Sequence, residues 1–130
     1  MEIKSITPLF NTKWLSLQKA AYIGKLGKEL QWEYVSRTNK AQVVTIICYS
    51  RVSKKYLLIS QPRVPVNKIV IEFPAGLVDE GESLVQAAIR ELEEETGYAG
   101  VVKRIHPFVV KSAGLSDEIL DLKEIPRRIC

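Results

Sequence analysis

An acidic cluster ends the stretch GLVDEGESLVQAAIRELEEETGY, residues 76–98, in a chain of net charge +4. Its members are Glu91, Glu93, Glu94 and Glu95. On a helix, carboxylates at positions 91 and 95 would share one face and repel each other. They would also lie at the helix C-terminus, where the helix dipole favours cations. Clustered carboxylate oxygens suit Mg²⁺ or Mn²⁺, and a bound cation would remove these costs.

The stretch around this cluster has the pattern of a single helix. Ser83 followed by Gln86 is typical of a capping box, and Gly97 is the expected left-handed residue after the helix. The expected core face is an arc of about 140° that holds Leu84, Val85, Ala88, Ile89 and Leu92. Glu95 falls inside this arc and Glu91 at its edge, so we expect Glu95 to be partly desolvated. A solvated acidic face is the competing explanation, but it does not account for a carboxylate inside the apolar arc.

Strands are expected on both sides of this helix in the sequence. They are predicted from apolar, β-branched runs bounded by turn residues at 13–23, 30–37, 41–49, 56–61, 69–73, 98–104 and 106–111. Strands mixed with one strongly periodic helix predict an α/β or α+β domain.

Composition narrows the class of protein. The chain has 130 residues, 46% of them hydrophobic and 26% charged, which is typical of a soluble globular domain. Its apolar runs are far shorter than the ~20 residues that span a bilayer, and its start has no signal-type apolar region. We therefore expect no membrane association and a cytoplasmic location. The pI is about 9.1, but lysine and arginine are scattered, so we expect no nucleic-acid partner.

The remaining residues that could do chemistry receive structural interpretations. Cys48 lies in the apolar run VVTIICY and is expected to be a buried core thiol, while Cys130 is the last residue. The pair shows neither a disulfide framework nor zinc-site spacing. His106, the single histidine, precedes a proline and is given no functional role.

The acidic stretch matches a known signature. The matching residues, at the spacing of the Nudix box, are Gly76, Glu82, Arg90, Glu91, Leu92, Glu94, Glu95 and Gly97. The chain thus resembles the Nudix hydrolases, although Tyr98 stands where that family prefers an aliphatic residue. The resemblance implies an α/β/α sandwich with a mixed sheet. It also implies hydrolysis of a nucleoside diphosphate linked to another moiety, with Mg²⁺ (or Mn²⁺) as cofactor.

The resemblance assigns roles within the box by position. It implies that Glu91 and Glu95 are metal ligands, together with the backbone carbonyl of Ala75, and that Glu94 completes the acidic cluster. The implied catalytic residues are Arg90, Glu91, Glu94 and Glu95. Glu82 would help Arg90 to orient the cluster, and the structural residues of the box would be Gly76, Glu82 and Gly97.

A second layer of similarity points to one branch of the family. The segments IEFPAGLVDEGES at 71–83, QPR at 61–63 and SAGLSDE at 112–118 look like those of ADP-ribose and ADP-sugar pyrophosphatases. In that branch an N-terminal β segment, here residues 1–40, supports dimerisation and base binding ahead of the Nudix domain, here 41–130. The resemblance therefore implies a homodimer that converts ADP-ribose or a related sugar nucleotide to AMP and a sugar phosphate.

The branch also implies a set of substrate-binding residues. Trp14 and Trp32 would sandwich the adenine, and stacking supplies ~1–3 kcal/mol per base. Glu33 would accept a hydrogen bond from the exocyclic amine of the base. The other expected contacts are Arg37, Arg63 and Leu77. Strand alternation places Trp32 and Arg37 on opposite faces unless the strand bends or a second protomer contributes.

The resemblance covers residues 12–122 and then stops. The tail KEIPRRIC, 123–130, does not resemble the family, and Pro126 is expected to interrupt a central strand. We therefore expect a C-terminally short fold without the general base of the family's late loop, so that Glu94, Glu118 or a partner chain would supply it. Two alternatives stay open: a Nudix hydrolase of another nucleotide, such as an oxidised guanine diphosphate, and a nucleotide-binding module with weak or no catalysis.

Overall fold

A computed structural model describes residues 1–110 and 112–127 of the chain. It divides into two compact units. The first contains Met1–Ala41 and Val110–Glu118, and the second contains Gln42–Val109 and Ile119–Cys130. The predicted domains, 1–40 and 41–130, stay a prediction. The structural units differ from them because Val110–Glu118 groups with the N-terminal strands.

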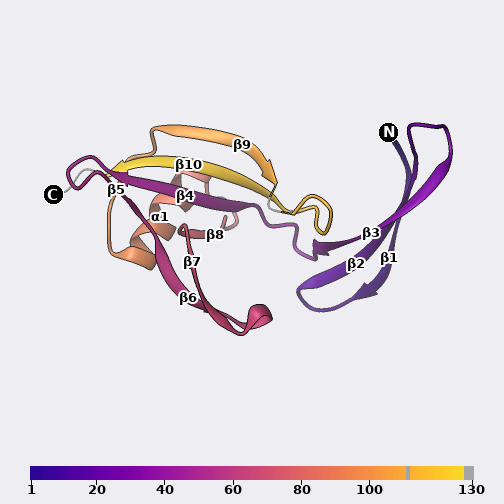
Figure 1. Cartoon of the computed structure of the whole chain (residues 1–130), viewed down its shortest axis with the longest axis horizontal. Helices are drawn as coiled ribbons and strands as arrows, with labels where there is room; N and C mark the ends of the chain where they lie inside the picture. The colour runs from indigo at the N-terminus through magenta and orange to yellow at the C-terminus, as the bar shows by residue number, and fades with distance from the viewer. Residues whose placement is uncertain (111, 128–130) are drawn as a thin grey trace. The chain divides into compact units, whose positions relative to one another are not determined.

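The first unit is built on a three-stranded antiparallel sheet (Figure 1). Its strands, in the order β1-β2-β3, are β1 (Glu2–Asn11), β2 (Leu15–Ile23) and β3 (Glu29–Arg37). The two predicted strands correspond to β2 and β3, whereas β1 was not predicted. The register of β2 with β3 is unbroken from Leu15↔Arg37 to Ile23↔Glu29. Side chains on β3 therefore alternate between the two faces along its whole length.

The second unit contains a mixed sheet in the order β5-β4-β10-β9, with β8 paired to the start of β4. Its strands are β4 (Val43–Ser50), β5 (Lys55–Leu57), β8 (Ala75–Leu77), β9 (Arg104–Val110) and β10 (Ile119–Arg127). β10 runs parallel to β4, and β5 and β8 run antiparallel to it. A separate hairpin of β6 (Ile59–Arg63) and β7 (Lys68–Glu72), with a 3-10 turn at Val64–Val66, extends away from this sheet (Figure 1).

The helix α1 (Leu84–Thr96) begins and ends as the sequence predicts. The Ser83 side chain accepts from the backbone N–H of Gln86, and Gln86 caps Ser83 in return. Gly97 has φ 71° and donates its N–H to the carbonyl of Glu93 at 2.8 Å. The mixed α+β architecture is thus confirmed, and the described residues supply the sheet and one helical layer.

The core lies between α1 and the face of β4 that it covers. Its fully buried members are Val44, Ile46, Cys48, Ala87, Ala88 and Leu92. The run VVTIIC forms β4 because β-branched side chains suit a strand whose inward positions are buried. Cys48 is a buried core cysteine, as expected. The expected core face of α1 was partly wrong, because Ala87 is buried while Val85 is 37% exposed.

Three strand predictions differ from the structure. Residues 98–103 form no strand, and β9 begins at Arg104. The predicted strand at 56–61 is two strands, β5 and β6. Pro126 does not interrupt β10, which pairs with β4 as far as Arg127↔Ser50. A proline removes a single N–H donor, and only alternate residues of a parallel strand donate to a given neighbour, so the ladder tolerates it.

Within the described part of the chain, α1 is too short and too polar to cross a membrane, and no other helix there meets that requirement.

Lys123 is the most unusual residue of the core. It pairs with Ile46 in the β4–β10 ladder, so its side chain lies on the face that α1 covers. It is fully buried, and its ammonium nitrogen has no hydrogen-bond partner in the part of the chain that the structure describes. Burial lowers the pKa of Lys123 from its ordinary value of 10.5, and the nearby Asp121 opposes that shift.

Replacing this lysine should stabilise the fold. We expect Lys123→Met to raise the free energy of unfolding at pH 7 by about 1–3 kcal/mol, the cost of an unsatisfied buried polar group. Because the unfolded chain holds this proton more tightly, the wild type should gain stability as pH rises from the lowered pKa toward 10.5, and the variant should not.

Urea unfolding at pH 7 and pH 10 measures both effects, with the exposed Lys103→Met as the matched control. Equal stability of wild type and Lys123→Met at pH 7 would contradict this description of the core.

Candidate active site

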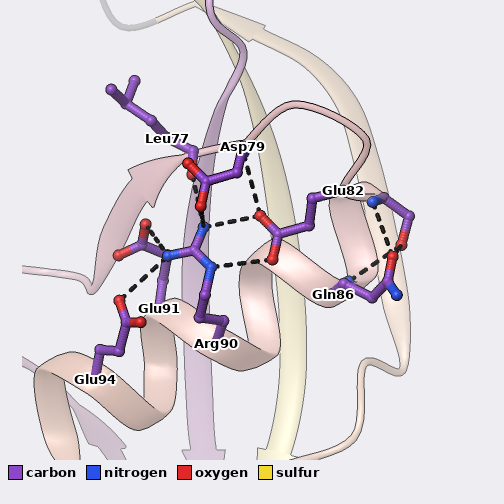
Figure 2. A network of polar contacts seen from close by, with 8 residues as sticks. Leu77, Asp79, Glu82, Gln86, Arg90, Glu91 and Glu94 are labelled. Carbon is purple, nitrogen blue, oxygen red and sulfur yellow. Dashed lines mark hydrogen bonds and ion pairs between the residues drawn. The ribbon is translucent and has the colours of Figure 1, made fainter.

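Arg90 is the centre of the polar network on α1 (Figure 2). Its Nε and Nη2 donate to the two carboxylate oxygens of Glu82 at 3.0 and 2.8 Å. Its Nη1 donates to Glu91 at 2.8 Å and to Glu94 at 3.2 Å. Nη2 also donates to the carbonyl of Leu77 at 3.0 Å. One guanidinium thus holds together α1, the preceding loop and the end of β8.

The electrostatics of this network favour its charged forms. The hydrogen bond from Arg90 holds the pKa of Glu82 below its ordinary value, with a further contribution from the backbone N–H of Asp79. The hydrogen bonds to Glu82 and Glu91 raise the pKa of Arg90 well above its ordinary value. The side chain of Arg90 is only 28% exposed, so these contacts are partly shielded from solvent.

Glu91 lies against the backbone of β8. Its carboxylate occupies the space that a side chain at Gly76 would need, because a Cβ there would lie 1.9–2.2 Å from the three carboxyl atoms. The side chain of Glu91 is 14% exposed. The glycine of the box is therefore explained by close packing: it leaves room for a carboxylate against the strand.

Glu95 meets the same strand one residue earlier. Its Oε2 accepts the backbone N–H of Ala75 at 3.0 Å. Burial raises the pKa of Glu95, and the negative charges of Glu91 and Glu72 add to this, while the Ala75 N–H and Arg63 oppose it. Glu91 and Glu95 are thus a repelling pair that converges on adjacent residues of β8.

The sequence assigned the burial of these two carboxylates the wrong way round. Glu95, expected inside the apolar arc, is exposed over a larger part of its surface than Glu91, expected at the edge. The cause is the rotation of α1, whose buried side includes Ala87 instead of Val85. The expected partial desolvation of Glu95 nevertheless agrees with the direction of its pKa shift.

The side chains around β8 offer the carboxylate oxygens that a hard divalent cation prefers as ligands. Glu91 and Glu95 bring two carboxylates to one strand, and an added positive charge would relieve their repulsion. Glu94 faces Arg90 and is 59% exposed. Among the described residues, no three acidic, histidine or cysteine side chains form a ready-made metal site. The predicted ligands Glu91, Glu94, Glu95 and Ala75 therefore stay a prediction.

Arg63 is the last residue of β6, next to the turn of the β6–β7 hairpin. Its Nε pairs with Glu72 at 2.7 Å, and Gln61 donates to the same carboxylate oxygen at 2.6 Å. Arg63 and Glu72 both affect the pKa of Glu95, so the charged pair of the hairpin is electrostatically coupled to the end of α1. The sequence singled out Arg63 but missed Glu72, whose only signal was its place in the segment IEFPAG.

The other predicted binding residues belong to the first unit. Trp32 is 50% exposed, and its Nε1 donates to the carbonyl of Gly114 at 3.1 Å. Arg37 donates from Nε to Glu118 at 2.5 Å. Glu33 is exposed on β3. Trp14 is 65% exposed and stacks with the Lys13 ammonium, 4.5 Å from the ring centroid.

The two tryptophans of one chain lie far apart along the sheet. The carbonyl of Trp14 accepts the backbone N–H of Thr38 at 3.1 Å, which places Trp14 just beyond the end of β3. Trp32 lies six residues before Thr38, about 20 Å away along a strand. Stacked rings have centroids only about 4.5–7 Å apart. A base held between two indoles therefore needs more than this sheet alone.

Comparison with known proteins identifies the family. The family model described as the NUDIX domain matches residues 39–118, more than half of the chain. The chain belongs to the Nudix family.

Two curated relatives and one solved structure are informative. The ADP-ribose pyrophosphatase of Saccharomyces cerevisiae is 35% identical over 130 residues, 94% of this chain and 56% of that protein. The ADP-sugar pyrophosphatase of Mus musculus is 37% identical over 112 residues, 81% and 51% of the two chains. This chain therefore spans about half the length of these relatives. The crystal structure of an ADP compounds hydrolase has a similar fold, with a TM-score of 0.72, 20% identity, and coverage of 96% of this chain and 66% of that one.

Filling the space beside Gly76 should disable the carboxylate pair. We expect Gly76→Ala to displace Glu91 and to weaken any Mg²⁺-dependent activity about a hundredfold, the cost of a misplacement near 1 Å. It should also abolish the rise in Tm that Mg²⁺ causes in the wild type.

The matched control is Gly24→Ala, whose Cβ would come closest to the end of the Leu30 side chain, at 2.8 Å, and would stay 3.6 Å from the Lys28 carbonyl oxygen. If Mg²⁺ raised the Tm of Gly76→Ala as much as that of the wild type, Glu91 would take no part in binding the ion.

Proposed function

We propose that this chain carries the Mg²⁺-dependent hydrolysis of ADP-ribose, or of a related nucleoside diphosphate sugar, to AMP and a sugar phosphate. The observation that carries the proposal is the convergence of Glu91 and Glu95 on β8, where Arg90 and the Ala75 N–H offset their repulsion only in part. The substrate class is supported by the names of the relatives, an ADP-ribose and an ADP-sugar pyrophosphatase.

In the proposed reaction, water attacks one phosphorus of the pyrophosphate. The bond from this phosphorus to the bridging oxygen breaks, and the bridging oxygen leaves with the other phosphate. Glu91 and Glu95, with the Ala75 carbonyl, would hold the cation, and Mn²⁺ could replace Mg²⁺. When bound, the cation offsets charge on the phosphorus under attack and on the leaving phosphate.

In the same proposal, side chains of the protein position the Glu91 carboxylate and accept the proton of the attacking water. Arg90 holds Glu91 through Nη1, and Glu82 fixes Arg90 in turn. Glu94 is the proposed acceptor of the proton from the attacking water, because it is 59% exposed and lies 3.2 Å from Arg90, farther than Glu91 at 2.8 Å. Arg63, near the Glu95 end of α1, would bind a phosphate oxygen.

The substitution Glu95→Gln tests the proposed metal-dependent hydrolysis. We expect the purified chain to release AMP from ADP-ribose in the presence of Mg²⁺, and Glu95→Gln to lose at least about a hundredfold in kcat/KM, because a neutral amide is a poor ligand for the cation. In the absence of Mg²⁺ the same variant should have a higher Tm than the wild type, because the repulsion with Glu91 is gone.

The measurement is chromatography of AMP, with melting curves in parallel and the exposed Glu93→Gln as the matched control. Mg²⁺-dependent binding of ADP-ribose without cleavage would identify a binding module instead. Faster cleavage of an oxidised guanine diphosphate would replace the proposed substrate.

We further propose that the adenine site is shared between two copies of the chain. Trp14 and Trp32 are separated along one sheet, and Trp32 and Arg37 lie on opposite faces of an unbent β3. A second copy would bring a Trp14 to the exposed Trp32 of the first, as a two-fold symmetric dimer allows. Arg37 and the exposed Glu33 and Leu77 remain the other proposed substrate contacts, and the cytoplasmic location and the absence of nucleic-acid partners stay predictions.

A mixing experiment tests the shared site. Trp14→Ala and Trp32→Ala should each weaken hydrolysis about tenfold or more, since a stacked base contributes ~1–3 kcal/mol. Unfolding and refolding the two variants together should restore about a quarter of wild-type activity, because half of the dimers are mixed and each has one intact site.

Sedimentation at the assay concentration supplies the oligomeric state. A monomeric active chain, or a mixture no more active than its components, would rule out the shared site and leave the Glu95 result unaffected.

A further inference from the structure

The segment 112–118, SAGLSDE, packs alongside β3 like a short parallel strand. The backbone N–H of Val35 donates to the carbonyl of Leu115 at 2.8 Å, and the N–H of Asp117 donates to the carbonyl of Val35 at 3.3 Å. A turn closed by Leu115 N–H and the Ser112 carbonyl at 2.9 Å shapes the segment. These backbone contacts place residues 114–118 beside the strand that carries Trp32 and Arg37.

Side chains of β3 add further contacts to this segment. Trp32 donates from its indole N–H to the carbonyl of Gly114 at 3.1 Å. The hydroxyl of Ser36, which is buried, donates to Asp117 at 2.9 Å. The negative charge of Asp117, after burial, also raises the pKa of Tyr34. The segment thus contacts the face of β3 that carries Trp32, Tyr34 and Ser36.

The opposite face of β3 carries the shortest of these contacts. Arg37 donates from Nε to an oxygen of Glu118 at 2.5 Å. The two side chains are only 39% and 22% exposed, so solvent screens the pair less than it screens an ion pair on the open surface. The contact uses one of the five N–H donors of the guanidinium, and a planar fork held at one corner keeps its terminal amino groups in a defined orientation.

We propose that Glu118 is a positioning residue, which orients Arg37 so that its terminal amino groups meet the nucleotide. This inference rests on the proposed function, because it assumes that Arg37 contacts the substrate. It gives Glu118 a role other than the general base, the role left open for it by the sequence, because Arg37 holds Glu118 at 2.5 Å whereas Arg90 contacts Glu94 at 3.2 Å. The carboxylate acts through another side chain and does not touch the reacting atoms.

A positioning role predicts a particular pattern of kinetic constants. Glu118→Ala should raise KM for ADP-ribose about tenfold, the loss of one charge-assisted hydrogen bond, with kcat changed by less than twofold. Glu118→Gln should recover most of the affinity, because its amide oxygen can still accept from Nε. The shape of the pH–rate profile should be unchanged in both variants.

A double-mutant cycle identifies the partner through which Glu118 acts. In the background of Arg37→Ala, the change Glu118→Ala should have almost no further effect on KM, since the group it positions is gone. Arg37→Lys should behave like Arg37→Ala, because an ammonium cannot contact Glu118 and the nucleotide with separate corners of one rigid fork.

The control is Glu2→Ala, which removes the exposed 2.8 Å ion pair between Glu2 and Lys4 in the same unit and should leave both constants unchanged. Additive effects of the Arg37 and Glu118 changes would overturn the inference. A large fall in kcat of Glu118→Ala would also overturn it, if the acidic limb of the pH–rate profile disappeared at the same time. That combination is the signature of a general base. If the unaltered chain binds no nucleotide, the proposed function fails and the ligand role of Arg37 fails with it, whereas unimpaired binding by Glu118→Ala would overturn this inference alone.

Discussion

The candidate site depends on the ion-pair network of Arg90. A helix that ends in glutamates is destabilised by charge repulsion and by its own dipole. Arg90 offsets part of that cost by pairing with Glu82, Glu91 and Glu94. Because one rigid guanidinium makes all of these contacts, the preceding loop, the helix and the end of β8 have a fixed geometry. Glu95 lies outside this network and retains a raised pKa.

Close packing against β8 is the second constraint on the same site. Gly76 has no side chain, so the Glu91 carboxylate can lie where a Cβ would otherwise be. Ala75 supplies the N–H that holds Glu95. A three-residue strand thus orients two like charges toward each other, at a cost in stability that a bound cation would offset. Functional sites commonly store strain of this kind, and the rest of the fold compensates for it.

The first unit has a separate organisation. Its exposed aromatic and charged side chains lie on a sheet whose strand β3 is paired on both sides, by β2 and by residues 114–118. That second neighbour lies between β9 and β10 in the sequence, although β10 and all of β9 except Val110 belong to the other unit. The chain therefore connects the proposed base-binding strand covalently to the sheet that supports α1.

The sequence by itself determined those helix ends, strands and acidic positions that have a strong local signal. The capping box at Ser83, the left-handed Gly97, the run VVTIIC and the spacing of the acidic residues are local patterns, and local patterns act through neighbours along the chain. β1 and β8 escaped prediction because their residues become strands through pairing with β2 and β4.

Only the tertiary structure decided which carboxylate is the less exposed and how the donors of Arg90 are shared among its partners (Figure 2). It also decided that Lys123 lies in the core without a hydrogen-bond partner among the described residues. It also decided that Glu118 meets Arg37 across 81 positions of the chain. Each of these depends on how one element is rotated or paired against another. Such contacts between residues distant in sequence leave no periodic signal in the amino-acid order.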